Sequence, residues 1–120
     1  MPQENNSFKK KFPFEKRLSE SSRILEKYDD RIPVIVTNSK HSTLPDIDKN
    51  KFLVPGDLTI TQFLYVIRKR INLNPAEALY ICVNESSLPP SSSSMSTLYV
   101  NYKDKDGFLY LTYCNENVFG

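Results

Sequence analysis

The residues that could carry chemistry are few, and they do not form a catalytic pattern. The single histidine, His41, lies in a polar segment rich in Asn, Ser, Lys and Asp. Cys82 and Cys114 lack the C-x-x-C spacing of metal and redox motifs, and no histidine motif accompanies either of them. We interpret His41 as a solvated side chain, and we expect no catalytic residues and no enzymatic activity.

The two cysteines allow two interpretations. The first is a pair of reduced, buried thiols in a cytosolic protein, and the second is a disulfide or a reactive site. The segment that begins Met-Pro-Gln-Glu-Asn-Asn-Ser has no apolar region of the kind found in secretory signals. We therefore favour reduced thiols.

Four aspartates stand in close pairs, which raises the question of a metal site. They lack the regular spacing of oxygen ligands in a calcium loop, and aspartate is also common in turns. We interpret them as turn residues and expect no metal and no cofactor. The four are Asp46, Asp48, Asp104 and Asp106.

Composition limits the function further. The chain has 120 residues, which suits one domain, and its net charge is +2, with 16 basic against 14 acidic residues. This balance gives no reason to expect nucleic acid as a partner. No window approaches the eighteen or so apolar residues of a membrane span, so membrane association would need a surface or a covalent lipid.

Apolar spacing and capping signals predict the helices. One stripe over 13–28 predicts a helix that buries Phe14, Leu18, Ser21, Leu25 and Tyr28. Glu20 and Ile24 lie off that stripe and beside each other, so Ile24 needs another partner. Residues 8–12 form a short basic helix or stay mobile. Thr59 and Gln62 form a capping box before a helix over 60–71, and a short helix is expected over 96–102.

Runs of β-branched and aromatic residues predict four strands, at 31–37, 51–54, 79–83 and 108–113. The first two should pair antiparallel across a polar loop. Because Pro33 cannot donate a ladder hydrogen bond, we expect its nitrogen to face a helix or an edge. Gly107 ends a turn and is free to take positive φ.

This order of elements predicts an α+β fold. Two strands, a crossover helix and two more strands make a ubiquitin-like β-grasp with a four-stranded mixed sheet, although other α+β rolls share the order. Two additional helices precede it. We divide the chain into a flexible N-terminus (1–7), an N-terminal helical subdomain (8–30), the β-grasp core (31–114) and a flexible tail (115–120).

Several long motifs in one order resemble a known family. They are PFEKR (13–17), RIPVI (31–35), LPDIDKNKFLVP (44–55), QFLYVIRKRI (62–71) and YKDKDGFLYLTY (102–113). Together they resemble the autophagy-related ubiquitin-like modifiers, the family of GABA type A receptor-associated protein and the microtubule-associated light chains. The resemblance runs from about Phe8 to Gly120. The chain departs from it at Cys82, where many members have an aromatic residue, at a longer stretch near Ser86, and at the serine run 91–94.

The resemblance implies conjugation through Gly120. Activating and conjugating enzymes would join its carboxyl group to phosphatidylethanolamine, and a cysteine protease would release it. The lipid is then a covalent modification, not a cofactor, and its two acyl chains suffice for stable anchoring. The protein would be cytoplasmic when unconjugated and would lie on autophagosome and vacuolar or lysosomal membranes when lipidated.

The resemblance also implies a peptide-binding surface along the strand 51–54. Cargo receptors and adaptors would add a strand there through aromatic-x-x-aliphatic motifs. The aromatic side chain would meet an aromatic set of residues, Glu20, Ile24, Pro33, Ile35, Lys51, Leu53 and Phe108. The aliphatic side chain would meet an aliphatic set, Phe52, Val54, Pro55, Leu58, Phe63 and Val66. Acidic residues flanking the motif would meet a basic set, Arg31, Lys49 and Arg70, together with Lys51.

Simpler roles remain for several of these residues. Ile35 and Phe63 also fit plain core patterns, and Lys49, Arg70 and the basic run near the N-terminus also fit solvated surface. Three other functions stay open. They are an interaction module that is never conjugated, a modifier of protein lysines and, least favoured, a nucleic-acid-binding protein.

Overall fold

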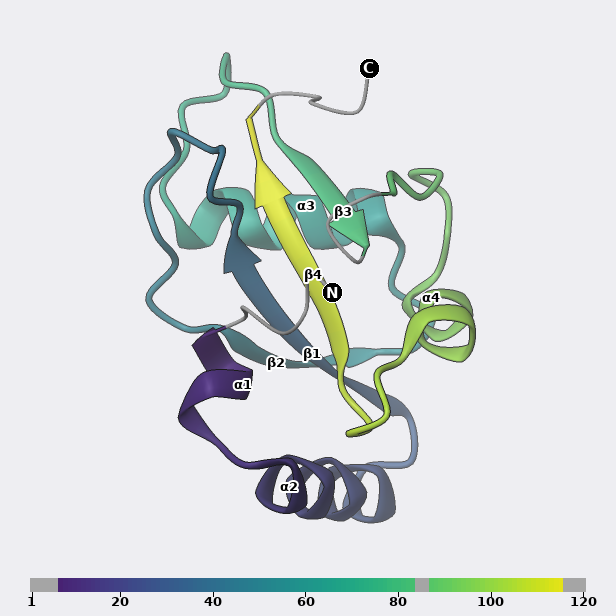
Figure 1. Ribbon diagram of the computed structural model, residues 1–120. Helices are drawn as coiled ribbons and strands as arrows, with labels where there is room; N and C mark the ends of the chain where they lie inside the picture. Colours follow the sequence, from purple (N-terminus) through teal and green to yellow (C-terminus); the bar gives the residue numbers. More distant parts are fainter. Residues whose placement is uncertain (1–6, 84–86, 116–120) are drawn as a thin grey trace.

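The computed structural model describes residues 7–83 and 87–115 (Figure 1). Gly120, the expected conjugation site, and Ser86 lie outside these residues. The eight elements are α1 (Ser7–Lys11), α2 (Phe14–Lys27), β1 (Arg31–Asn38), β2 (Lys51–Pro55), α3 (Ile60–Arg70), β3 (Tyr80–Val83), α4 (Met95–Tyr102) and β4 (Leu109–Cys114). None of the described helices is long and apolar enough to cross a membrane.

The four strands form one mixed sheet in the order β2-β1-β4-β3. β1 pairs antiparallel with β2 and parallel with β4, and β3 pairs antiparallel with β4. This topology, with α3 as the crossover and two helices before β1, confirms the predicted α+β β-grasp. It leaves β2 and β3 as the two edge strands.

Two apolar clusters lie on opposite faces of the sheet. Ile32, Val34 and Val36 of β1 alternate into the main cluster, which α3 covers. Ile35 points to the other face, where it packs with Phe8 of α1 and Phe108. Figure 1 shows α3 behind the strands and α1 in front of them. Because β1 is covered on both faces, its sequence is continuously apolar and does not alternate.

The predicted capping box of α3 is confirmed. The backbone N–H of Gln62 donates to Thr59 Oγ1 over 3.2 Å, and the N–H of Thr59 donates to the Gln62 side chain over 2.9 Å. Two of the N–H groups that the first turn leaves unpaired are thus satisfied. Gly107 has φ 88°, as its place in the turn before β4 predicts.

The predicted helix over 13–28 forms, but its predicted buried stripe is only partly right. Ser21 is buried and Leu25 packs against the main cluster, as predicted, whereas the other three members of the stripe are exposed. Phe14, Leu18 and Tyr28 each keep 40% of their surface exposed, whereas Ser21 is fully buried and Arg17 is 9% exposed. A Cβ on Gly107 would lie 2.9 Å from the Ser21 Cβ, so α2 approaches this turn more closely than a large side chain would allow. α2 is therefore rotated so that its small Ser21 and its Arg17 face the sheet.

Pro33 lies where its missing N–H costs no hydrogen bond. The N–H of Val36 donates to Asn50 O over 2.7 Å, and that of Gly56 donates to Asp30 O over 3.1 Å. Even-numbered residues of β1 therefore bond to β2, and odd-numbered ones turn away from it. Pairing with β4 starts only at Val34, so the proline nitrogen faces the end of the sheet.

Candidate functional site

The outer edge of β2 presents backbone groups that do not bond to a neighbouring strand. β2 has β1 on one side, and the described residues place no strand on its other side. In the antiparallel register Lys51 is opposite Ile35 and Leu53 is opposite Pro33. Both belong to pairs that do not bond to β1, so the N–H and C=O groups of Lys51 and Leu53 point to the free edge. An extended peptide could pair with these groups.

The two faces of β2 differ as the sequence predicts. Phe52 and Val54 are buried, whereas Leu53 is 36% exposed and Lys51 is half-buried. Leu53 and Lys51 lie on the side of α2, and Phe52 and Val54 lie on the side of α3. The strand therefore separates the two expected sets of residues, with its polar edge between them.

The structure brings the aromatic set together. Lys51 forms an ion pair with Glu20 of α2, which joins that helix to the edge strand. Ile24 packs against the cluster of Ile35 and Phe108, which answers the need for a partner created by its place off the stripe. Ile35 and Phe108 are fully buried, and Ile24 packs on them, while Leu53 lies exposed on the same face of β2 as Lys51.

The aliphatic set also gathers, between β2 and α3. The Phe52 and Phe63 rings meet edge to face with centroids 5.7 Å apart, and Phe63 is fully buried. Leu58 is partly buried against the same cluster, and Val66 of α3 remains 38% exposed. Phe52, Val54 and Phe63 thus belong to the main core, and Leu58, Pro55 and Val66 provide the accessible part.

The basic set lies around β2 and is only lightly engaged. Arg31 Nη1 donates to Leu53 O over 3.4 Å, and Lys49 Nζ lies 5.3 Å from the centre of the Phe52 ring. Arg70 Nε is 2.9 Å from Asp48 Oδ1, in a pair whose members are 40% and 73% exposed. Exposed pairs of this kind contribute little, so these cations can exchange partners at small cost.

Sequence reasoning missed a buried polar network that fixes α2 against the turn before β4. Asp106 is fully buried, and its Oδ2 accepts from Arg17 Nη1 over 2.6 Å and from the Tyr110 hydroxyl. Its Oδ1 accepts from the N–H of Phe108 over 2.9 Å, and Ser21 Oγ donates to its backbone oxygen over 2.5 Å. The spacing of Arg17, Ser21 and Ile24 along one helix face is the signal that could have revealed it.

This network perturbs the titration of its members. Burial raises the pKa of the Tyr110 hydroxyl well above its usual range, and the neighbouring Asp106 adds to the shift. Burial alone would lower the pKa of Arg17, but hydrogen bonding to Asp106 leaves that pKa raised. Both shifts favour the state in which Arg17 is charged and Tyr110 is neutral, so the network keeps one protonation pattern at neutral pH.

The remaining candidate residues lie apart from the β2 edge. His41 is exposed, and Asp104 and Asp106 lie in the turn before β4. Cys82 and Cys114 are both buried, with their sulfurs 4.0 Å apart. Among the described residues no group of three or more His, Cys, Asp or Glu side chains is placed to hold a metal.

Comparisons with known proteins agree on one family. Residues 16–120 match the family described as "Autophagy protein Atg8 ubiquitin like". The chain is 57% identical over 115 residues to autophagy-related protein 8 of Vanderwaltozyma polyspora, covering 96% of this chain and 97% of that one. It is 55% identical to autophagy-related protein 8d of Arabidopsis thaliana, covering 96% and 95%.

A solved structure gives the same answer for the fold. The crystal structure of Trypanosoma brucei ATG8 superposes with a TM-score of 0.89 at 40% identity, covering 97% of this chain and 99% of that one. The likeness therefore includes the N-terminal helices as well as the β-grasp. The chain belongs to the Atg8 family of ubiquitin-like autophagy proteins.

Proposed function

We propose that this protein is conjugated through Gly120 to phosphatidylethanolamine and then recruits cargo receptors to autophagosomal membranes through aromatic-x-x-aliphatic motifs. The observation that carries the proposal is the β2 edge. Its backbone groups at Lys51 and Leu53 face away from β1, where only the long contact from Arg31 to Leu53 O meets them, and an apolar set of residues lies on each side of it. Strand addition at such an edge supplies affinity through the backbone and specificity through alternate side chains.

Conjugation needs a reactive carboxyl group that is open to attack. Glycine has no side chain, so successive enzyme sites can reach its carbonyl, and a methyl group would crowd them. Activation would form an acyl adenylate and then thioesters, before an amide forms with the lipid amine. The protein acts in this sequence as the substrate of activating, conjugating and deconjugating enzymes, and needs no catalytic residue of its own.

Conjugation is tested by reconstitution with the activating and conjugating enzymes and phosphatidylethanolamine vesicles, read by mass spectrometry. The wild-type chain should gain the mass of one lipid. Gly120→Ala should sharply reduce the adduct, and deletion of Gly120 should abolish it, with no loss of peptide binding. An adduct on the deleted chain would show that the attachment site is wrong. A wild-type chain that never reacts would favour an unconjugated adaptor.

Peptide binding is tested by calorimetry with a peptide that carries the motif. Interfaces of this small size should bind at micromolar strength, about −8 kcal/mol. Ile24→Ala with Leu53→Ala should weaken binding strongly, because Ile24 packs on the buried Ile35 and Phe108 and Leu53 is exposed on the same side of β2. Val100→Ala, which shortens a side chain 73% exposed on α4, is the matched control and should change nothing. Unchanged affinity in a folded double variant would refute this assignment.

A further inference from the structure

The chain that follows β4 is held by the loop between β1 and β2. β1 and β4 run parallel and end together, with Asn38 opposite Tyr113, and the pairing of β4 with β3 ends at Cys114. Asn115 follows directly, and Gly120 is the fifth residue after it. The loop that leaves β1 starts at this same end of the sheet, whereas α2 lies at the opposite end (Figure 1).

Asn115 and Thr43 of that loop form a two-point contact. The N–H of Thr43 donates to Asn115 Oδ1 over 3.3 Å, and Asn115 Nδ2 donates to Thr43 Oγ1 over 2.6 Å. One amide side chain therefore meets both a backbone group and a side-chain group of a single loop residue. Two such bonds fix the orientation of Asn115 as well as its position, which one bond alone does not. We call this pair the tail clamp.

The loop side of the tail clamp is fastened to the core. Leu44, the neighbour of Thr43, is buried in the main cluster. The Tyr113 hydroxyl donates to Pro45 O over 2.6 Å, and the N–H of Ser39 donates to Tyr113 O over 2.9 Å. Because Tyr113 is fully buried, these bonds join the loop to a fixed part of β4. Both partners of the clamp are thus placed before they bond, so the clamp forms at a small cost in conformational entropy.

The place of the tail clamp matters for the chemistry proposed at Gly120. There the Gly120 carboxylate attacks the α-phosphorus of ATP and releases pyrophosphate, and a cysteine of the activating enzyme then displaces AMP to form the thioester. Five residues of extended chain reach at most about 18 Å from Asn115. An enzyme that holds the folded domain meets the carboxylate only within this radius, and a fixed starting direction narrows the positions that the carboxylate occupies.

We propose that the Thr43–Asn115 clamp positions the tail for conjugation, by setting the direction in which the chain leaves β4 toward the site of the activating enzyme. The proposal rests on the function proposed above. Neither residue touches a reacting atom, and both act through the chain that follows them. Ordering a segment in advance reduces the entropy that is lost on binding, so the clamp should act on KM and leave kcat unchanged.

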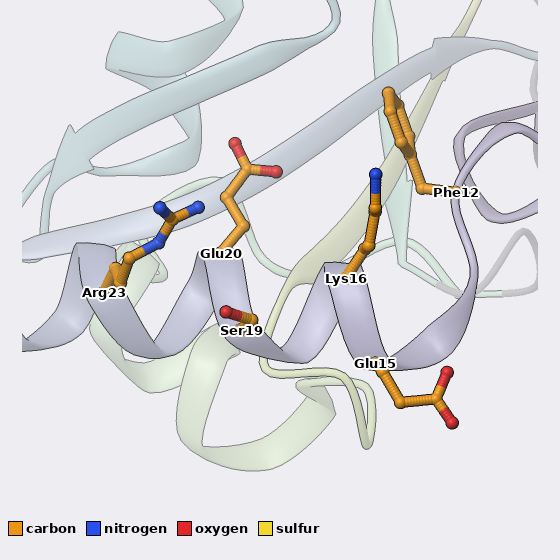
Figure 2. Close-up of a pocket in the computed structure, with 6 residues that line it drawn as sticks. All are labelled: Phe12, Glu15, Lys16, Ser19, Glu20 and Arg23. Carbon is orange, nitrogen blue, oxygen red and sulfur yellow. The ribbon is translucent and has the colours of Figure 1, made fainter.

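The experiment measures pyrophosphate release by the activating enzyme, with ATP and conjugating enzyme in excess, at increasing concentrations of the full chain. Thr43→Val removes the hydroxyl at nearly constant shape, and Thr43→Ser, which keeps a hydroxyl, is the rescue variant. Asn115→Ala removes both bonds, and its combination with Thr43→Val completes a double-mutant cycle. The control, Ser19→Ala, removes an exposed hydroxyl from α2 (Figure 2). Circular dichroism confirms that each variant is folded.

The expected result is a change in KM alone. Because Thr43 is exposed to water, each bond contributes modestly. Asn115→Ala should raise KM about fivefold, which corresponds to about 1 kcal/mol, and Thr43→Val should raise it about twofold. The double variant should be no worse than Asn115→Ala. Thr43→Ser and Ser19→Ala should both match wild type, and kcat should be the same throughout.

Three results would overturn the proposal. In the first, Asn115→Ala leaves KM unchanged. In the second, Asn115→Ala raises KM but Thr43→Val does not, which would indicate that Asn115 contacts the enzyme directly. In the third, kcat falls while KM stays constant, which would place the effect on the chemical step. If the wild-type chain releases no pyrophosphate, the proposed conjugation fails instead, and the clamp loses its role.

Discussion

At the scale of single residues, the buried carboxylate of Asp106 links segments that are far apart in the sequence. Its partners are Arg17, 89 residues earlier in the chain, Phe108 in its own turn and Tyr110 of β4. Removing two charges from water is costly, and a buried pair returns that cost only when its hydrogen bonds are complete. Here both carboxylate oxygens are satisfied, so the pair fixes the position of α2 more than it adds stability.

Replacing one member of the Arg17–Asp106 pair should lower the free energy of unfolding more than replacing both. Arg17→Met leaves a buried carboxylate without its cation and should lower the free energy of unfolding by about 3 kcal/mol. Arg17→Met with Asp106→Asn should lose less, because no unpaired charge remains. Urea unfolding of both single variants and the double variant measures the coupling. Additive losses would show that the two side chains stabilise the fold independently.

At the scale of elements, the sheet and its helices create the two sides of the candidate site. β2 presents Leu53 and Lys51 toward α2 and presents Phe52 and Val54 toward α3. The strand itself is short, so α2 and α3 determine the shape of each side. The start of α3 depends on its capping box, and that cap can be altered without touching either side.

Thr59→Ala should lower the free energy of unfolding by about 1 kcal/mol, because the N–H of Gln62 loses its acceptor at Thr59 Oγ1. Thr59→Ser keeps a side-chain oxygen and is the matched control, so it should stay close to wild type. Thermal unfolding should show a drop of about 4 °C for alanine. An equal drop for serine would assign the effect to the lost methyl group instead of the cap. Peptide affinity should not change in either variant.

At the scale of the whole molecule, the stability of the fold should depend on pH through the tyrosine that connects α2 to β4. The folded state raises the pKa of Tyr110 above its unfolded value of about 10. A raised pKa stabilises the folded state below the unfolded pKa and loses that contribution as the pH rises through and beyond it. The protein should therefore lose stability progressively above about pH 10.

The variant Tyr110→Phe isolates the contribution of the Tyr110 hydroxyl to the pH dependence of stability. The variant should be less stable than wild type at pH 7, because Asp106 loses a hydrogen-bond donor. Its stability should fall less steeply above pH 10, because the ionisable hydroxyl is gone. Tyr113, whose pKa burial raises to about 12, remains in both proteins and cancels in the comparison. Parallel slopes for the two proteins between pH 9 and 11, measured by urea unfolding, would contradict the assignment.

The sequence by itself determined the elements and their order. β-Branched runs, the capping box at Thr59 and the turn glycine Gly107 act over a few residues, so their signals lie in neighbouring positions. The long motifs determined the family, which the comparisons confirm. The residues of the aromatic and aliphatic sets came from that resemblance, and the structure brings them together without testing their role.

The tertiary structure decided which face of α2 is buried. The periodicity placed Ser21 and Leu25 on the buried side, but it also selected Phe14, Leu18 and Tyr28, which remain substantially exposed. Which face of the helix is buried depends on the element against which it packs. α2 packs against a turn that lies some 85 residues later, where Ser21 and Arg17 form hydrogen bonds with Asp106. No local pattern contains that information, because the turn and the helix become neighbours only when the sheet forms.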